Sequence, residues 1–188
     1  MRKMVALILA TVLACSIGAC GKTPEKKNSG VNIDELQSAI REFDEQAVVR
    51  KSQGDDGYTF NYSNDDYFGV TVSGTADANE MLTSVVATAT HVNAEYLKDL
   101  TATQFIADMA NSNNVAMNKL AGEMLLVEFS YIAKLLSPED VSSKVYLEGL
   151  DILLNAIKTP QTSGNWKYTV TTNISGESAT IKAQFIDE

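Results

Sequence analysis

Acidic side chains gather in predicted turns of the chain, where they could bind a cation. Asp55 and Asp56 follow one predicted strand, and Asp77 follows another strand two turns later. In an antiparallel meander alternate turns lie at the same end of the sheet, so these two turns would be about 10 Å apart. Asp55, Asp56 and Asp77 are therefore candidate Ca²⁺ ligands, because Ca²⁺ prefers several carboxylate and carbonyl oxygens. The same residues are typical of metal-free turns, since Asp forms local hydrogen bonds there.

No pattern for nucleophilic catalysis or for a zinc site follows Cys20. His91 is the only histidine, and no cysteine occurs after Cys20. A zinc site usually takes three or four His or Cys ligands, and a histidine base needs a nucleophile and an orienting acid. We expect no cofactor. Glu123 and Glu128 remain as carboxyls for glycoside hydrolysis, which uses paired carboxylates, but their spacing does not select such a pair.

The start of the chain has the order of a secretory signal peptide. Residues 1–3 are positively charged, residues 4–17 are almost entirely apolar, and small residues follow. The apolar run of 14 residues is shorter than the roughly 20 residues that cross a bilayer. The run therefore predicts a signal peptide and not a permanent membrane helix.

Ile17-Gly18-Ala19-Cys20 resembles the lipobox of bacterial lipoproteins, in which an aliphatic residue and two small residues precede a cysteine. The resemblance covers residues 1–20 only. It implies a diacylglyceryl group on Cys20, cleavage after Ala19, and an envelope location on the exported side of a membrane. Gly21 carries no inner-membrane retention signal, which favours the outer membrane if the source has two membranes. An ordinary signal peptide with a chance cysteine is the alternative.

The composition sets limits on partners. Cleavage leaves 169 residues and changes the formal charge from −9 to −11, because it removes Arg2 and Lys3. An acidic chain disfavours nucleic acid and is compatible with a basic protein partner. The mature chain lacks any pair of cysteines, so it depends on packing for its stability. Residues 1–19 are thus a predicted signal peptide, 20–31 a lipidated cysteine and flexible tether, and 32–188 a single domain.

The periodicity of the domain changes along the chain from helix to strand to helix to strand. Asn32 and Glu35 form a capping pattern for a helix that ends near Glu45. Four strands follow where apolar and polar residues alternate. They cover residues 47–53, 58–63, 68–73 and 83–92, with a tight turn at 64–66.

Helices are predicted between residues 93 and 159. One begins at a capping box of Thr101 and Gln104, and another begins at Ser137-Pro138. The central helix over 115–136 should bury one face, made of Met117, Leu120, Ala121, Met124, Val127, Tyr131 and Leu135.

Alternation returns over residues 166–171 and 179–185, which predicts a closing hairpin. The fold class is therefore α+β. We expect an antiparallel sheet of about six strands, a four-stranded meander plus a C-terminal hairpin, with helices packed on one face. The aromatic residues of the strands could line a ligand cavity, and the alternative is that they form the core. This set is Tyr58, Phe60, Tyr62, Phe68, Trp166 and Tyr168.

Two functions are compatible with these patterns. The first is a membrane-anchored envelope lipoprotein whose domain binds or interacts without catalysis, supported by the lipobox and by the lack of a catalytic motif. The alternative is an enzyme or carrier that acts on lipid or envelope glycan and uses carboxyls such as Glu123 or Glu128.

The lipobox leads to a first testable prediction. Cys20→Ala removes the thiol that receives the lipid, so we expect loss of palmitate-analogue labelling and a shift out of the membrane fraction. Cell fractionation and metabolic labelling measure both. A Cys20→Ala protein that is still labelled and membrane-bound would refute the lipoprotein interpretation, and Cys15→Ala is the matched control.

Overall fold

The computed structural model describes residues 27–63, 69–138 and 146–187. The signal peptide, Cys20 and the turn predicted at 64–66 lie outside these residues. The described residues form one seven-stranded antiparallel sheet in the order β1-β2-β3-β4-β7-β6-β5. Its strands are β1 (Arg50–Gly54), β2 (Gly57–Ser63), β3 (Thr71–Ala76), β4 (Leu82–Thr90), β5 (Gln161–Ser163), β6 (Trp166–Asn173) and β7 (Ser178–Phe185).

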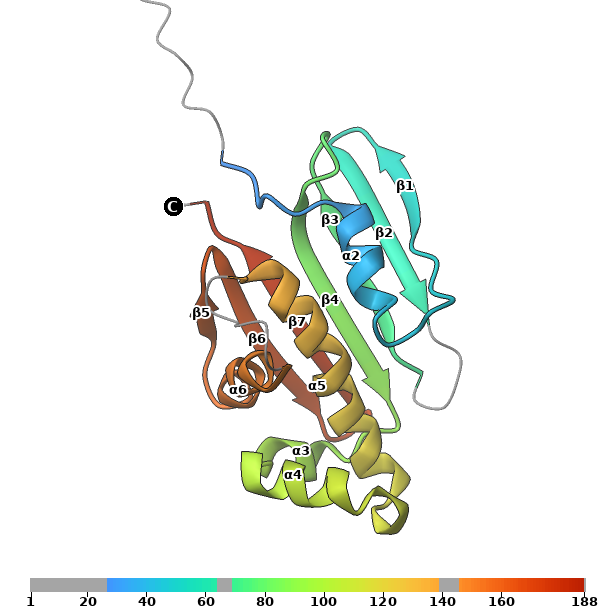
Figure 1. Ribbon diagram of the computed structural model, residues 1–188, viewed down its shortest axis with the longest axis vertical. Coiled ribbons are helices and arrows are strands. Elements are labelled where there is room, and N and C mark those ends of the chain that lie inside the picture. Colours follow the sequence, from blue (N-terminus) through green and yellow to red (C-terminus); the bar gives the residue numbers. More distant parts are fainter. Residues whose placement is uncertain (1–26, 64–68, 139–145, 188) are drawn as a thin grey trace, which may run out of the picture.

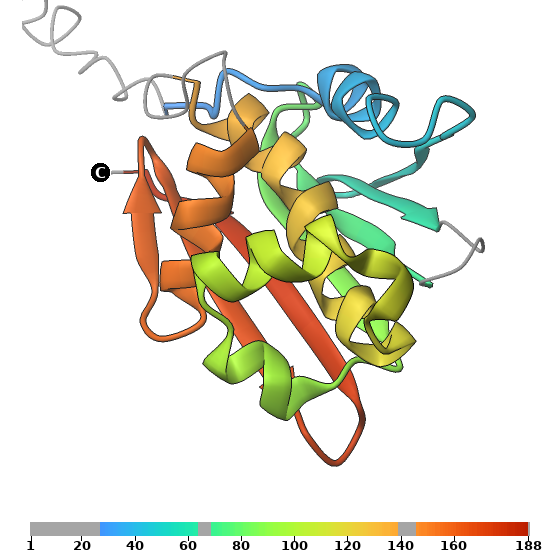
Figure 2. The ribbon, with the colours of Figure 1, turned by 60° about the horizontal axis from the view of Figure 1, so that its bottom comes forward.

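The helices form a single layer on one face of this sheet (Figures 1 and 2). In Figure 1 the long helix α5 crosses in front of β4 and β7, with α2 and α6 on either side of it. Helices α3 and α4 lie at the end of the layer. The helices are α2 (Ile33–Ile40), α3 (Ala94–Asp99), α4 (Ala102–Ala110), α5 (Met117–Leu136) and α6 (Tyr146–Ala156).

The α+β prediction with helices on one face is confirmed. The meander is β1 to β4, and the C-terminal hairpin is β6 and β7, which pairs with β4. The seventh strand, β5, comprises only three residues and was not predicted because so short a segment shows no alternation. Its pairing with β6 extends the sheet at the edge opposite β1.

The first helix ends earlier than expected. Asn32 and Glu35 form the complete capping box, with side chain to backbone distances of 2.9 Å in both directions. The helix nevertheless ends at Ile40, before the predicted end near Glu45, and turns follow. At Thr101 only half of the predicted box forms. The Thr101 hydroxyl accepts from the Gln104 amide, but the Gln104 side chain donates to Asp108.

The buried residues of helix α5 cover a wide arc around the helix and do not form one narrow stripe. Its predicted face was partly wrong, because Met117 is 57% exposed, and Val127 and Tyr131 are only half-buried. The fully buried apolar side chains are instead Leu125, Leu126, Phe129, Ile132 and Ala133. A helix between two other helices and a sheet needs apolar residues over a wide arc, which leaves no single stripe to read from the sequence.

The strands separate apolar from polar side chains. Residues that pair directly across an antiparallel sheet point to the same face, and neighbours along a strand point to opposite faces. One set packs against the helices, and most of the predicted aromatic residues belong to it. Phe60, Tyr62, Trp166 and Tyr168 are buried there and form core. Tyr58 is half-buried, and Phe68 lies outside the described residues.

The other set forms the face of the sheet that no helix covers, which we call the open face. None of its twenty-one paired side chains is buried, and fourteen of them carry hydroxyl groups. They form four rows across the strands: Ser52, Thr59, Thr75, Ser84, Gln184, Lys167 and Thr162; Arg50, Asn61, Ser73, Val86, Lys182 and Thr169; Ser63, Thr71, Thr88, Thr180 and Thr171; and Thr90, Ser178 and Asn173.

The contact between α5 and α6 gives a second prediction. A Cβ atom on Gly149 would lie 2.9 Å from the backbone oxygen of Ser130, so the two helices would have to separate. Alanine is a better helix former than glycine by about 1 kcal/mol, but overpacking costs roughly 1–3 kcal/mol. We expect Gly149→Ala to lower the free energy of unfolding, measured by urea denaturation. Asn155→Ala, on the exposed side of α6, should leave stability unchanged or raise it slightly.

Candidate functional site

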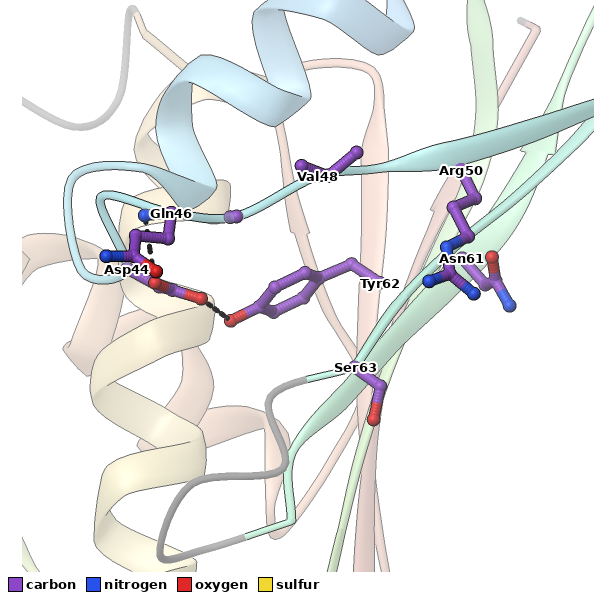
Figure 3. A pocket seen from close by; sticks show the side chains of 8 residues that line it. Asp44, Gln46, Val48, Arg50, Asn61, Tyr62 and Ser63 are labelled. Carbon is purple, nitrogen blue, oxygen red and sulfur yellow. Dashed lines mark hydrogen bonds between the residues drawn. The ribbon is translucent and has the colours of Figure 1, made fainter.

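A polar pocket of about 450 Å³ opens at the edge of the sheet formed by β1 and β2. Its volume is within the range of small-molecule sites, roughly 300–1,000 Å³. The pocket combines side chains of the segment between α2 and β1 with side chains of the two strands (Figure 3). It is lined by Asp44, Gln46, Ala47, Val48, Arg50, Asn61, Tyr62 and Ser63.

One wall of the pocket is an irregular segment that α2 holds in place. Arg41 Nε donates to the backbone oxygen of Ala47 at 3.0 Å, and Gln37 Oε1 accepts from the amide of Val49 at 3.0 Å. These hydrogen bonds pair a backbone carbonyl and a backbone amide that have no partner strand at this point. The wall is therefore formed before any ligand arrives, and binding does not have to order it.

Asp44 is fixed in one orientation at this wall. The Tyr62 hydroxyl donates to Asp44 Oδ2 at 2.6 Å, and the Gln46 amide donates to Oδ1 at 3.1 Å. Figure 3 shows Tyr62 pointing from β2 toward Asp44. Both carboxylate oxygens thus accept a hydrogen bond, so the geometry of Asp44 is set by the protein itself.

Arg50 supplies the cationic side of the pocket, and it belongs to the face of the sheet that no helix covers, at the edge strand β1. It pairs directly with Asn61 across β1 and β2, and the two side chains lie side by side in Figure 3. A guanidinium group is a planar fork of donors that fits a carboxylate or phosphate. The Asn61 amide and the Ser63 hydroxyl add neutral donors and acceptors. This arrangement is suited to a small polar ligand with an anionic group.

Glu128 is buried on α5 and interacts electrostatically with Asp44. Its side chain is 6% exposed, and Oε2 has no hydrogen-bond partner among the described residues. Burial, with a further contribution from the charge of Asp44, raises the pKa of Glu128 to about 7. Glu128 does not line the polar pocket. A buried carboxylate without a partner is costly, so this group binds a proton near neutral pH.

Glu123 belongs to a separate cluster that joins α3, α4 and α5. The Tyr96 hydroxyl contacts both Asp108 and Glu123, with 2.5 Å to Glu123 Oε1. Because a tyrosine carries only one hydroxyl proton, the second contact requires a proton from a carboxyl. Burial raises the pKa of Glu123 to about 6, whereas the hydrogen bond from Tyr96 lowers the pKa of Asp108. Of the two carboxyls, Glu123 therefore has the higher pKa and takes up a proton first as pH falls.

The structure therefore places the two predicted carboxyls in different surroundings. Glu128 interacts with Asp44, and Glu123 contacts Tyr96 and Asp108. Sequence reasoning found both residues but could not show that they are buried, because a charge in a mostly apolar helix normally marks the exposed side. The pocket residues Asp44, Arg50 and Asn61 were missed. They belong to an irregular segment and to strand edges, and no motif marks such places.

The three candidate metal ligands do lie at one end of the sheet. Asp55, Asp56 and Asp77 line one shallow pocket together. Asp77 Oδ1, however, accepts from the backbone amides of Asn79 and Met81, at 2.8 and 3.0 Å, which is the local role of a turn aspartate. Within the described part of the chain, no three His, Cys, Asp or Glu side chains are grouped to hold a metal ion.

His91 lies directly after β4 and is exposed, with a left-handed backbone at φ 61°. It is distant in sequence from the pocket residues and lines none of the pocket walls described above. No helix in the described ranges has the length and apolar character needed to cross a membrane.

Comparison of the chain with models of known protein families, with curated proteins and with solved structures finds no match.

The buried carboxyl on α5 leads to a third prediction. Glu128 keeps its proton up to about pH 7 in the native state, whereas its ordinary pKa is 4.5. The unfolded chain releases this proton at a lower pH than the native protein does. The free energy of unfolding therefore falls as pH rises from 4.5 to 7. Glu128→Gln removes the effect. We expect the free energy of unfolding of Glu128→Gln to exceed that of the unsubstituted protein by roughly 2–3 kcal/mol at pH 8 and to equal it at pH 4.

Urea denaturation at both pH values measures this difference. Glu45→Gln changes the net charge equally from an exposed position and should alter stability little at either pH. Equal effects of Glu128→Gln at pH 4 and pH 8 would contradict the prediction.

Proposed function

We propose that this protein is a lipid-anchored lipoprotein of a bacterial cell envelope whose domain binds a small polar, anionic ligand without catalysis. The anchor rests on the lipobox at Cys20, which holds the protein to a membrane on the exported side, the outer membrane if there are two. The binding activity rests on one observation, the preformed polar pocket with Arg50 on one side and Asp44 on the other.

Binding is favoured over catalysis because of where the carboxyls lie. A general acid needs a raised pKa and access to the substrate. Glu123 and Glu128 have raised pKa values, but both are buried in the helix layer and do not line the pocket. Asp44 lines the pocket, but its two oxygens already accept hydrogen bonds that fix it in place. The alternative, an enzyme or carrier acting on lipid or envelope glycan, has no observation of comparable weight.

A basic protein partner is a second proposed interaction, carried by the exposed acids around α2. Asp34, Glu35, Glu42 and Glu45 are all exposed on this helix or directly after it. Acidic residues gathered on one surface attract a basic partner and accelerate its association. This surface belongs to the helix layer and not to the sheet face that bears Arg50.

Photo-crosslinking in intact cells tests the proposed pocket. A photoreactive amino acid at Asn61 reports on the pocket, and the same amino acid at Asn155 reports on the exposed side of α6. We expect a reproducible small-molecule adduct at Asn61, identified by mass spectrometry, and none at Asn155. Arg50→Gln should reduce the adduct several-fold, because it removes the charged fork.

The control for Arg50→Gln must remove one exposed positive charge away from the pocket. Arg41 is unsuitable because it holds the pocket wall, so Lys98→Gln is the matched control. It should leave the adduct unchanged. Absence of any reproducible adduct at Asn61 in anchored, folded protein would count against the proposed function. Turnover of an envelope glycan or lipid by the purified protein would favour the enzymatic alternative.

A further inference from the structure

The charge of the open face differs from the charge of the chain. The chain has 24 acidic residues and a formal charge of −9, yet none of the acidic residues falls within any of the seven strands. The open face carries three cations, Arg50, Lys167 and Lys182, and no acid. The strand residues of an acidic protein therefore present a surface whose charges are all positive, although the turn residues Asp55, Asp56 and Asp77 adjoin its end near Ser52, Thr59 and Thr75.

The other open-face side chains are almost all hydrogen-bonding groups. Several hydroxyls already form chains across strands, such as Thr75 with Ser84 at 2.9 Å and Thr88 with Thr180 at 3.1 Å. A hydroxyl both donates and accepts, so such rows suit a ligand that carries many hydroxyl groups of its own. Val86 is the one apolar side chain of the face.

The cations are spaced for an extended ligand. Lys182 pairs directly with Thr169, and Lys167 is two residues from Thr169 on the same strand, so the lysines are diagonal neighbours roughly 7–8 Å apart. Arg50 lies four strands away from β7 in the sheet order, which is about 19 Å. A single small anion cannot span that distance, whereas a chain running across the strands can.

We infer that the open face is a docking surface for an anionic glycan, whose chain crosses the strands from Lys167 and Lys182 toward Arg50. Carboxylate or phosphate groups of the glycan pair with the cations, and its hydroxyls bind the threonine and serine rows. The choice of a glycan rests on the proposed envelope location, where such polymers occur. The charge and hydroxyl pattern does not depend on that location.

A neutral glycan and a membrane surface fit the open face less well. The strand aromatics Tyr62, Trp166 and Tyr168 are buried against the helices, so they do not stack on a sugar ring at the open face. Affinity must therefore come from charge and hydrogen bonds. Proteins that lie on a bilayer insert apolar side chains at the headgroup boundary, and Val86 alone is a poor anchor of that kind.

The test measures binding of the full-length lipoprotein, in neutral detergent and at low salt, to polygalacturonate and to uncharged dextran. We expect binding to polygalacturonate and none to dextran. The double variant Lys167→Gln/Lys182→Gln should weaken binding roughly tenfold. Its matched control is Lys98→Gln/Lys158→Gln, which removes the same charge from exposed residues of the helix layer and should weaken binding about twofold or less.

Equal losses in the two double variants would overturn the proposal, because they would show a response to net charge alone. Absence of polygalacturonate binding would overturn it as well. So would tighter binding of the unlipidated Cys20→Ala protein to phosphatidylglycerol vesicles, measured without detergent and dependent on Lys167 and Lys182, since the face would then be a membrane surface. Thr88→Val/Thr180→Val keeps strand propensity and should reduce affinity without unfolding the sheet.

This assay uses purified protein and replaces Lys167 and Lys182, which do not line the pocket, so it is independent of the Cys20 labelling experiment. Arg50 and Asn61 belong to both the pocket and the open face, so the two lysines separate the proposals. Loss of the Asn61 adduct in Lys167→Gln/Lys182→Gln would assign the adduct to the open face, whereas an unchanged adduct together with lost polygalacturonate binding would leave the proposed pocket standing.

Discussion

The two-residue alternation along the strands is the constraint on which both faces of the sheet depend, the one that packs against the helices and the open face. It directs Phe60, Val85 and Ile181 into the helix layer and Thr59, Thr88 and Thr180 to the open face. A shift of one residue in the register would exchange the two sets and bury rows of hydroxyls without partners. The packing of the core thus fixes the hydroxyl and charge pattern of the open face, although no open-face side chain contributes to that core.

This constraint also explains which parts of the fold the sequence predicted. Alternation is local and has a strict period, so β2, β4, β6 and β7 could be identified from single segments. The buried arc of α5 could not, because it depends on how α2, α6 and the sheet surround that helix. Leu125 and Met117 are both apolar, but only the assembled layers decide that Leu125 is fully buried and that Met117 is 57% exposed.

The candidate site was beyond prediction for a related reason. Its wall is an irregular segment held by the side chains of Gln37 and Arg41, and hydrogen bonds between side chain and backbone leave no periodic signal. Glu123 and Glu128 were visible as charges, but their roles depend on Tyr96, Asp108 and Asp44, which come from other elements. Burial has turned these two carboxyls into groups that bind a proton near neutral pH, at a cost to stability that good packing of α5 must offset.

The distribution of charge shows how far net charge can mislead about partners. A formal charge of −9 disfavours anionic ligands when the charge is spread evenly. Here no acid lies within the seven strands of the described residues, while Arg50, Lys167 and Lys182 share one face of the sheet. Because exposed charges are screened beyond about 10 Å, the charges nearest to a surface decide what that surface attracts. The local arrangement of charge, and not the net charge of the chain, therefore determines which class of ligand a given surface favours.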